Sequence, residues 1–590
     1  MKYFFTKSSF LLFALVLMTS AVMAQFTVTG TISDSEGEPL IGATVLVKGT
    51  ALGTVTDFDG NYSINVPGDA GELEFSYTGY SSMTMDVSST NSQVDVILDS
   101  SSTQLDEVVV TGLASSVKRS NSANSVASIG AKELTGVTTQ ATMDGALYGK
   151  FKGADIRSNS GAPGGGMSIK LRGVTSIFGS QQPLYIVDGV FVDNSTVSQG
   201  TNIVSSAAGG GSTATNQDDA SNRIADIDPE DIESIEILKG ASAAAIYGSR
   251  AAGGVVLIST KKGKAGRTKI GISQSIGLTS AISLLGDRGW DVEKVREVFG
   301  DDEAARAQTN GFNDYEKELY GGNGVLSTSR FTLSGGTEKT QFFVGATYKD
   351  DEGLVANTGY EKVSIRANID HKLADWLDLS ITNNYINSSS DRGFFNNSNS
   401  NTTVGYALAF TRPWENLFAD ENGNYPAAQT VQSNVLETVN TITNNEKVNR
   451  YIGGGTATWK IMTTENQSLK LVARAGLDQY ALRNTGLFPQ TLQFYRSPSS
   501  LRGVSISGTT VNTNVNLSAF LVHSYFTESG LNFRTQVGVT QEDFDQNTVI
   551  TTASTLNGSQ TNIDQAANIG AFQNRVIQQD KGFFVQEEVN

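Results

Sequence analysis

From residue 265 onward the chain repeats one pattern: segments of about ten residues in which apolar and polar side chains alternate. Successive side chains of a β-strand point to opposite faces of the sheet, so each segment predicts a strand with one apolar and one polar face. The clearest segments are Lys269–Leu278, Arg330–Gly335, Gln341–Tyr348, Lys362–Ile369, Trp376–Asn383, Leu469–Leu477 and Leu517–Val522. Long polar stretches at 280–327 and 388–448 predict loops. The repeat is typical of a transmembrane antiparallel β-barrel, although a soluble β-sandwich can show the same alternation.

The first 24 residues have the three parts of an export signal. Lys2 and Lys7 form a basic start, residues 10–18 form an apolar core, and Val22-Met23-Ala24 is a small-residue cleavage site. The apolar core is too short to cross a bilayer, which takes about 20 residues, and no later stretch qualifies as a membrane helix. If this exported chain enters a membrane, we therefore expect it to do so as a β-barrel.

Composition argues against several functions. The net charge of −17 argues against nucleic acid, whose phosphates need basic patches. The sequence has no cysteine, so thiolate chemistry, disulfides and a lipid anchor on an N-terminal thiol are excluded. Its two histidines, His371 and His523, lie far apart, which disfavours His-based catalysis and a His-rich metal site. Abundant glycine (61) and scarce proline (9) fit extended strands and polar loops better than helical bundles.

Residues 25–99 predict a small all-β domain, which we expect to be a β-sandwich. Turn residues separate short alternating segments at Phe26–Ile32, Ala43–Lys48, Gly53–Asp57, Tyr62–Pro67, Leu73–Tyr77 and Val94–Leu98. Asp57-Phe58-Asp59-Gly60 resembles the start of a calcium loop. The glutamate that such a loop needs later is missing, so the sequence favours a hairpin turn there.

This N-terminal pattern resembles a known module. Gly30-Thr31-Ile32, Pro39-Leu40-Ile41-Gly42-Ala43 and the run from Thr56 to Tyr62 are similar to the carboxypeptidase-regulatory-like domain. The resemblance implies a β-sandwich module that is not itself a peptidase.

Residues 113–264 show a mixed pattern that predicts an α+β domain. Asp228-Pro229-Glu230-Asp231 predicts a helical turn, because proline is favoured at the first helical position. A stretch rich in Gly, Ser, Ala and Asn at about 200–222 predicts a loop. Short helices are predicted at Ala146–Phe151 and Ala241–Tyr247, and strands at Met167–Val174, Pro183–Val190, Glu233–Gly240 and Gly253–Thr260.

Three features of this domain suggest chemistry, and the sequence disfavours each of them. Gly161–Gly166 lacks the Gly-Lys-Ser/Thr of a phosphate loop, and Gly248–Gly254 lacks the Rossmann spacing. Glu233 and Glu236, close to Glu230-Asp231, would point to opposite faces of one strand, so they do not form a glycosidase pair. We therefore expect turns and structural carboxylates here, with no enzymatic activity, no cofactor and no metal.

A short strip before this domain predicts a strand-addition site. It consists of Asp106, Glu107, Val108, Val109, Val110, Thr111 and Gly112, with a serine-rich run before it and small polar residues after it. A β-prone strip with few local partners can add its unpaired backbone to the edge of another protein's sheet. An ordinary interdomain linker that contains three valines is the alternative.

Motifs in the mixed domain resemble the plug of TonB-dependent outer-membrane transporters. They are Leu184–Gly189, Ile232–Glu236, Leu238–Gly240, Ala244–Arg250 and Val255–Ile258. Together with the preceding sandwich and the strip 106–112, they resemble the SusC/RagA subfamily. This resemblance implies that 106–112 is the TonB box, which TonB binds from the periplasm.

The fold implied by the resemblance is mostly β. We expect a signal peptide at 1–24, a carboxypeptidase-regulatory-like β-sandwich at 25–99, a linker and TonB box at 100–112, a plug at 113–264 and a partial transmembrane β-barrel at 265–590. A complete barrel of this family is expected to have about 22 strands, and the sequence shows about ten. The last residues do not resemble a terminal aromatic strand, so we expect the N-terminal portion of a longer protein.

The function implied is energised import of a nutrient, an oligosaccharide or a peptide, across the outer membrane of a Gram-negative cell. The expected partners are TonB, a SusD-like surface lipoprotein and outer-membrane lipid. The alternatives are a siderophore or vitamin receptor, a secreted β-rich adhesin or glycan-binding protein, and an exported hydrolase. Aromatic residues in the predicted loops could stack on sugar rings, but the sequence favours their use as loop anchors; they are Phe394, Phe395, Phe410 and Trp414.

Overall fold

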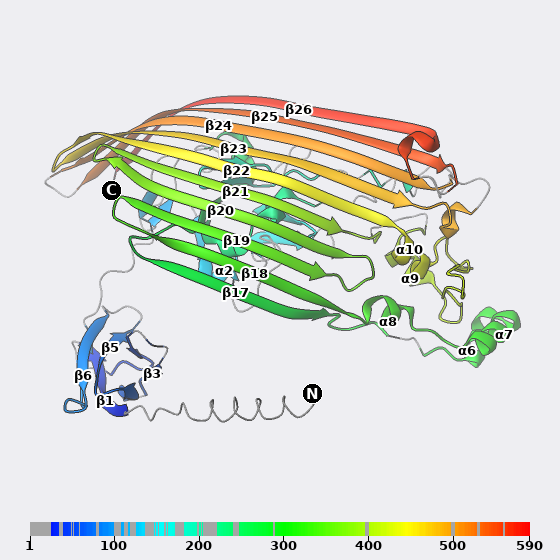
Figure 1. The fold of residues 1–590 in the computed structure, drawn as a ribbon, viewed down its shortest axis with the longest axis horizontal. Coiled ribbons are helices and arrows are strands. Elements are labelled where there is room, and N and C mark those ends of the chain that lie inside the picture. The colour runs from blue at the N-terminus through cyan, green and yellow to red at the C-terminus, as the bar shows by residue number, and fades with distance from the viewer. Residues whose placement is uncertain are drawn as a thin grey trace, which may run out of the picture. The chain divides into compact units, whose positions relative to one another are not determined.

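The structure is a computed structural model, and Figure 1 shows its fold. It divides into two compact units, one with the N-terminal domain and one with residues 121–590. The residues that it describes are 25–34, 39–48, 50, 52–57, 59–77, 82–98, 108–110, 116–118, 126–135, 147, 149–151, 153–158, 161, 163–171, 182–197, 200–201, 203–204, 221–239, 247–286, 289–395, 401–496, 502–527, 531–558 and 561–589. The predicted signal peptide, residues 100–107, residues 241–246 and most of the predicted loop at 200–222 lie outside this set.

The N-terminal unit consists of two sheets around one apolar core. One sheet has the order β4-β1-β7 and the other β3-β2-β5-β6. The strands are β1 (Gln25–Asp34), β2 (Thr44–Val47), β3 (Gly53–Val55), β4 (Asn61–Pro67), β5 (Ala70–Ser76), β6 (Met83–Ser88) and β7 (Val96–Leu98). Alternate side chains of β4 enter the core, as a half-buried strand requires. The sequence pattern missed β6, because Val87 is its only fully buried side chain.

Asp57 closes a hairpin turn. Its Oδ1 accepts hydrogen bonds from the backbone N–H of Asp59 at 3.0 Å and of Asn61 at 2.8 Å. The bond from the Asn61 backbone is the largest cause that lowers the pKa of Asp57. Among the described residues, no group of three or more His, Asp or Glu side chains could hold a metal ion.

The second unit contains an inner domain, which we define as its described residues 126–260. Its main sheet has the order β10-β15-β16-β13-β14, in which β13 and β16 are parallel and the other neighbours are antiparallel. These strands are β10 (Val126–Gly130), β13 (Leu184–Val187), β14 (Val190–Val192), β15 (Ile232–Leu238) and β16 (Val255–Thr260). All four residues of β13 and five of the six in β16 are buried, which explains their continuous apolar sequence.

Short elements complete the inner domain. The hairpin of β11 (Ala154–Ser158) and β12 (Met167–Leu171) forms a separate small sheet. The helical elements are α2 (Ala131–Thr135), η2 (Arg223–Asp226), η3 (Pro229–Asp231) and η4 (Ser249–Gly253). Asp228 caps η3 by accepting from the Glu230 N–H at 3.0 Å, so the predicted helical turn is confirmed.

A ten-stranded sheet, which we call the wall, follows in sequence order. Each strand is antiparallel to the next, and Figure 1 shows the strands side by side in one long sheet, consistent with part of a barrel. They are β17 (Gly266–Ser280), β18 (Asn323–Gly336), β19 (Thr340–Glu352), β20 (Gly359–Ala374), β21 (Leu377–Asp391), β22 (Thr443–Thr463), β23 (Gln467–Phe488), β24 (Val504–Phe526), β25 (Asn532–Leu556) and β26 (Ala566–Val589).

The wall has an apolar outer face and a polar inner face. On β21, Ile381 and Tyr385 are exposed, whereas Thr382 and Asn384 are buried against the inner domain side. The strands are longer than the predicted ten residues, because the alternation is strong only in their central parts. The clearest segments in the sequence do not include β22, β25 and β26, because glycine, asparagine and glutamine interrupt their apolar positions. The expected number of about ten strands agrees with the ten strands of the wall.

The two stretches predicted as loops contain helices, so that prediction is partly wrong. They fold onto one another through a few apolar side chains that the polar composition hides, among them Val295 and Trp414. The helical elements between wall strands are α6 (Val292–Phe299), α7 (Asp301–Asn310), α8 (Tyr315–Tyr320), α9 (Val404–Phe410), α10 (Val435–Thr441), η5 (Gln493–Tyr495) and η6 (Ile563–Gln565). Among the described residues, no helix is long and apolar enough to cross a membrane.

Candidate functional site

The strip predicted for strand addition forms a strand at Val108–Val110 (β8). The prediction of an unpaired backbone is wrong for these three residues, because β8 forms a two-stranded sheet with β9 (Ser116–Lys118). A pair of three-residue strands is marginal on its own, so a longer strand from another protein could displace it. Asp106, Glu107, Thr111 and Gly112 lie outside the described residues.

The inner domain contacts the wall through buried charges. Arg366 of β20 places Nη1 3.4 Å from Asp188 Oδ2 and Nε 3.3 Å from Asp231 Oδ2. Arg330 of β18 pairs with Asp231 and lies 3.7 Å from Asp228 Oδ2. The acids all belong to the inner domain and the cations to the wall, and every one of these side chains is less than 10% exposed. Buried charges of this kind are stable only when they are paired.

Local structure holds these acids in place. Asp188 has a left-handed backbone (φ 49°) in the turn before Gly189, and its carboxylate accepts from the N–H and hydroxyl of Thr260 at 3.0 and 2.5 Å. Burial by itself would raise the pKa of Asp228, but the charges of Lys362 and Arg330 outweigh it and lower that pKa. Asp228 is therefore ionised at neutral pH.

A second cluster centres on Arg450 of β22, which is fully buried. Its Nε and Nη2 each lie 2.8 Å from a carboxylate oxygen of Asp478 on β23. It also donates to the Asp226 carboxylate at 3.0 Å, to the Asp193 carbonyl at 3.0 Å and to the Arg223 carbonyl. One wall arginine thereby joins two separate segments of the inner domain.

Arg223 extends this cluster toward the end of the wall where β22 begins. Its Nη2 lies 2.7 Å from Glu446 Oε1, and that oxygen also accepts from the Ser221 hydroxyl at 2.5 Å. Burial alone would lower the pKa of Arg223, but the charges of Asp226 and Glu446 raise it, so the guanidinium keeps its charge.

Wall side chains also bind the free edge of the inner sheet, at β14. Asn516 of β24 accepts from the Phe191 N–H and donates to the Gly189 carbonyl, both at 3.1 Å. Asn514 donates to the Phe191 carbonyl at 3.1 Å, and Asp478 accepts from the Asp193 N–H at 2.8 Å. These wall side chains take the place of a neighbouring strand, so they satisfy backbone N–H and C=O groups at the edge of the inner sheet.

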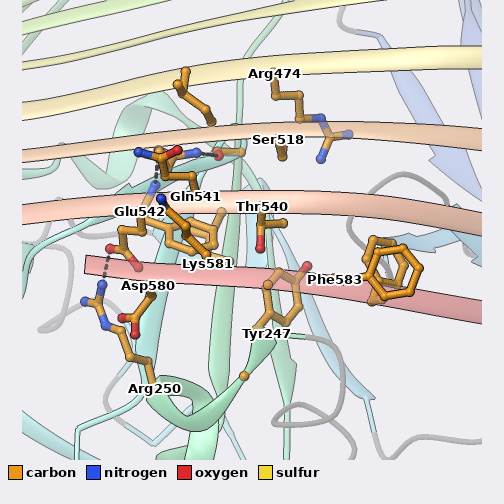
Figure 2. Close-up of a pocket in the computed structure, with 18 residues that line it drawn as sticks. Tyr247, Arg250, Arg474, Ser518, Thr540, Gln541, Glu542, Asp580, Lys581 and Phe583 are labelled. Carbon is orange, nitrogen blue, oxygen red and sulfur yellow. Dashed lines mark hydrogen bonds and ion pairs between the residues drawn. The ribbon is translucent and has the colours of Figure 1, made fainter. Parts of the chain in front are cut away.

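A cavity of about 330 Å³ lies between the inner domain and the wall. Figure 2 shows Tyr247 and Arg250 of the inner domain on one side and side chains of β23–β26 on the other. Arg250 pairs with Glu542 of β25, and burial raises the pKa of the Tyr247 hydroxyl. The lining mixes aromatic rings with hydroxyl, amide and charged groups, a chemistry suited to water or a small polar solute.

The loop aromatics divide between two uses. Phe394 and Trp414 are buried anchors, as the sequence favoured, and the Trp414 Nε1–H donates to Glu303 at 2.8 Å. Phe395 is partly buried, whereas Phe410 is 55% exposed and is available for contact with a ligand.

The sites that the sequence disfavoured have structural uses. Gly164 lies in a turn with φ +67°, and Gly248 and Gly254 flank η4 with φ +77° and +96°. Glu233 is exposed and Glu236 buried, so the two carboxylates do not converge.

Five wall residues of this interface were not predicted from the sequence: Arg330, Arg366, Arg450, Asp478 and Glu446. Their signal is a charge at an inward position of an alternating strand, as Arg366 shows within the predicted segment Lys362–Ile369. That pattern identifies the face but not the partner across the interface.

Two family descriptions match the chain. Residues 28–110 match the CarboxypepD_reg-like domain, and residues 118–255 match the TonB-dependent receptor plug domain. The chain is 32% identical to the TonB-dependent receptor SusC of Bacteroides thetaiotaomicron over 411 residues, which cover 68% of this chain and 38% of SusC. The chain belongs to the SusC/RagA-like TonB-dependent receptors. These are outer-membrane receptors that act as transporters and not as enzymes.

Further relatives agree with this assignment. The TonB-dependent receptor P26 of Formosa agariphila is 32% identical over 448 residues, which cover 72% of this chain and 41% of P26. The RagAB peptide importer in its open-open state has a similar fold, with a TM-score of 0.60, 20% identity, and coverage of 82% of this chain and 55% of that one. The chain spans about two fifths of the length of the curated relatives that it matches. From here on, the inner domain is called the plug.

Proposed function

We propose that the complete protein imports a nutrient across the outer membrane, energised by TonB through the box at Asp106–Gly112. The observation that carries this proposal is the interface between plug and wall. Its contacts include many buried hydrogen bonds and ion pairs, beside apolar contacts such as those of Val197 and Val204. Water can replace the polar contacts when the plug shifts. The box is the strand-forming segment that leads into the plug, and a pull on it would reach the plug first.

The outer face of the wall fits a lipid environment. Its exposed apolar side chains alternate with buried polar ones. The ring of Trp376, in the turn before β21, stacks on the ring of Trp459 of β22, with the ring centroids 6.3 Å apart. Tryptophan in such a position is typical of the membrane–water interface. We also propose the domain division of the chain: a signal peptide at 1–24, a carboxypeptidase-regulatory-like β-sandwich at 25–99, a linker and TonB box at 100–112, a plug at 113–264 and a partial transmembrane β-barrel at 265–590.

The substrate class that we propose is an oligosaccharide or a peptide, with a SusD-like surface lipoprotein as the partner that captures it. RagAB is described as a peptide importer, and the present chain shares its fold at 20% identity. Exposed loop residues such as Phe410 could contact either class of substrate.

The affinity of the purified full-length receptor for the periplasmic domain of TonB tests the coupling step. Replacing Val108–Val110 by glycine should weaken binding on the order of tenfold or more, because glycine disfavours the extended strand. The control replaces Ser100-Ser101-Ser102 by glycine in the same linker. Equal affinity of both variants and the wild type would refute the assignment of the box.

A further inference from the structure

Part of the plug reaches into the loops that join the wall strands. Val204 is fully buried in an apolar cluster that we call the loop core, and Ile203 packs against it. The other members come from β23–β25 and from the connections β21–β22 and β23–β24. They are Phe394, Ile442, Phe488, Leu492, Phe494, Tyr495, Val504, Ile506 and Ile550. An element of the plug therefore completes the core of these loops.

The described residues of this element at the loop core are closely fitted. Gly200 has φ +80°, and a Cβ there would lie 2.9 Å from Ile550 Cγ2 and 3.5 Å from Ile506 Cγ2. The Val204 N–H donates to the Thr201 carbonyl at 3.0 Å. A larger residue at 200 would push these residues out of the loop core.

The base of the element is clamped. Asn194 Oδ1 accepts from the Ile224 N–H at 2.8 Å, and Thr196 bridges to Asn222, so the two ends lie side by side. Arg450 binds both ends, through the Asp193 carbonyl and the Asp226 carboxylate. We call the described residues 193–197, 200–201, 203–204 and 221–226 the arm.

The base continues directly into the plug sheet. On one side Asp193 follows β14, whose edge is bound by Asn514 and Asn516. On the other side η2 leads to Asp228 and Asp231, which pair with the wall. A displacement of the arm would therefore change the contacts that hold the plug.

We propose that the arm couples the outer loops to the plug. A rearrangement of the loop core displaces Val204, and the arm transmits this displacement to the clamp at Arg450 and to the edge of the plug sheet. This inference rests on the proposed import function, in which binding outside must reach the plug. Packed cores transmit such shifts because they have discrete arrangements and deform little.

A second apolar cluster in the loops provides the contrast. It contains Val404, Ala407, Leu417, Val435 and their neighbours, and none of its described members belongs to the plug. Both Val204 and Val404 are fully buried, so shortening either to alanine removes the same two methyl groups. Only Val204→Ala should affect the plug.

Hydrogen exchange of the full-length receptor, purified in detergent, tests the inference. Val204→Ala should raise exchange about fivefold or more at the amides of Phe191, Asp193 and Ile224, which are bonded at the base of the arm. Val404→Ala should leave these amides unchanged and affect only its own loops. Ile506→Ala, which opens the same core from the wall side, should repeat the effect of Val204→Ala.

Two results would overturn the inference: a change confined to residues 200–204 in Val204→Ala, or equal changes at the base of the arm in Val204→Ala and Val404→Ala. If Val204→Ala fails to reach the outer membrane, Ile506→Ala decides alone. The exchange assay needs neither TonB nor substrate. A negative result there would refute the coupling by the arm alone, because the import proposal is tested separately, with the variant of Val108–Val110.

Discussion

Replacing Arg450 by methionine should loosen the plug more than the loss of one ordinary hydrogen bond. Methionine keeps an unbranched apolar stem but removes every donor of the guanidinium. The substitution leaves Asp478, which is 0% exposed, without its cation, and it removes the donors to Asp226 and to two backbone carbonyls. Breaking one side of a buried ion pair costs about 3–5 kcal/mol, because the remaining charge stays buried.

The expected loss of free energy in Arg450→Met is large enough to measure by hydrogen exchange. Because about 1.4 kcal/mol corresponds to a factor of ten, a loss of about 3 kcal/mol raises the local opening equilibrium about a hundredfold. Hydrogen exchange at the Asp193 amide of the purified receptor measures this opening, since that N–H is bonded to Asp478. Arg450→Met should therefore exchange about a hundredfold faster there.

A double variant separates the buried charge from the lost bonds. Arg450→Met with Asp478→Asn removes the uncompensated carboxylate as well, so it should be less destabilised than Arg450→Met alone. A double variant that exchanges faster than the single one, or a single variant that matches the wild type, would refute the account of this interface.

Three further predictions concern other parts of the chain. Trp414→Ala removes a ring that is 1% exposed and should destabilise the loop helices by about 3–5 kcal/mol, measured as faster protease cleavage within residues 281–322 on intact cells. Burial raises the pKa of Tyr62 to about 12, so folding favours the neutral phenol. The resulting stabilisation, about 2–3 kcal/mol, is present below pH 10 and lost as the pH rises through 12. Tyr62→Phe should abolish this alkaline loss in near-UV circular dichroism. Gly164→Ala places a Cβ in collision with the Tyr360 ring at φ +67°, so it should lower receptor abundance in the outer membrane, and Tyr360→Ala should restore part of it.

The local pattern of the sequence predicted most strands correctly. The predicted strands Gly253–Thr260 and Glu233–Gly240 correspond to β16 and β15. A continuous apolar run indicates a strand that is buried on both faces, and an alternating run indicates a strand that is buried on one face. The mostly β fold with an N-terminal β domain, a plug and part of a barrel wall agrees with the family matches. The helices at Val292–Phe299 and Asp301–Asn310 were missed, since their apolar contacts come from distant residues such as Trp414.

The interface between plug and wall could not be predicted, because its pairs are far apart in sequence. Asp231 and Arg366 are separated by 135 residues, and Asp193 and Asp478 by 285. Periodicity places each charge on the inner face of its strand, but the register of the sheet and the position of the plug decide which charges meet. The pairing of β8 with β9 was missed because β9 is a short polar segment with little strand signal.

Growth of cells that carry the full-length gene tests the central claim most directly. Cells with Val108–Val110 replaced by glycine are compared with the Ser100–Ser102 control on a panel of oligosaccharides and peptides, each as sole nutrient, at equal outer-membrane abundance. The import account predicts a selective loss of growth on one nutrient with the box variant alone, which would also identify the substrate class. A loss restricted to iron or vitamin limitation would place the protein among siderophore or vitamin receptors. Unchanged growth under every condition, with the protein present, would contradict the account and favour an adhesin.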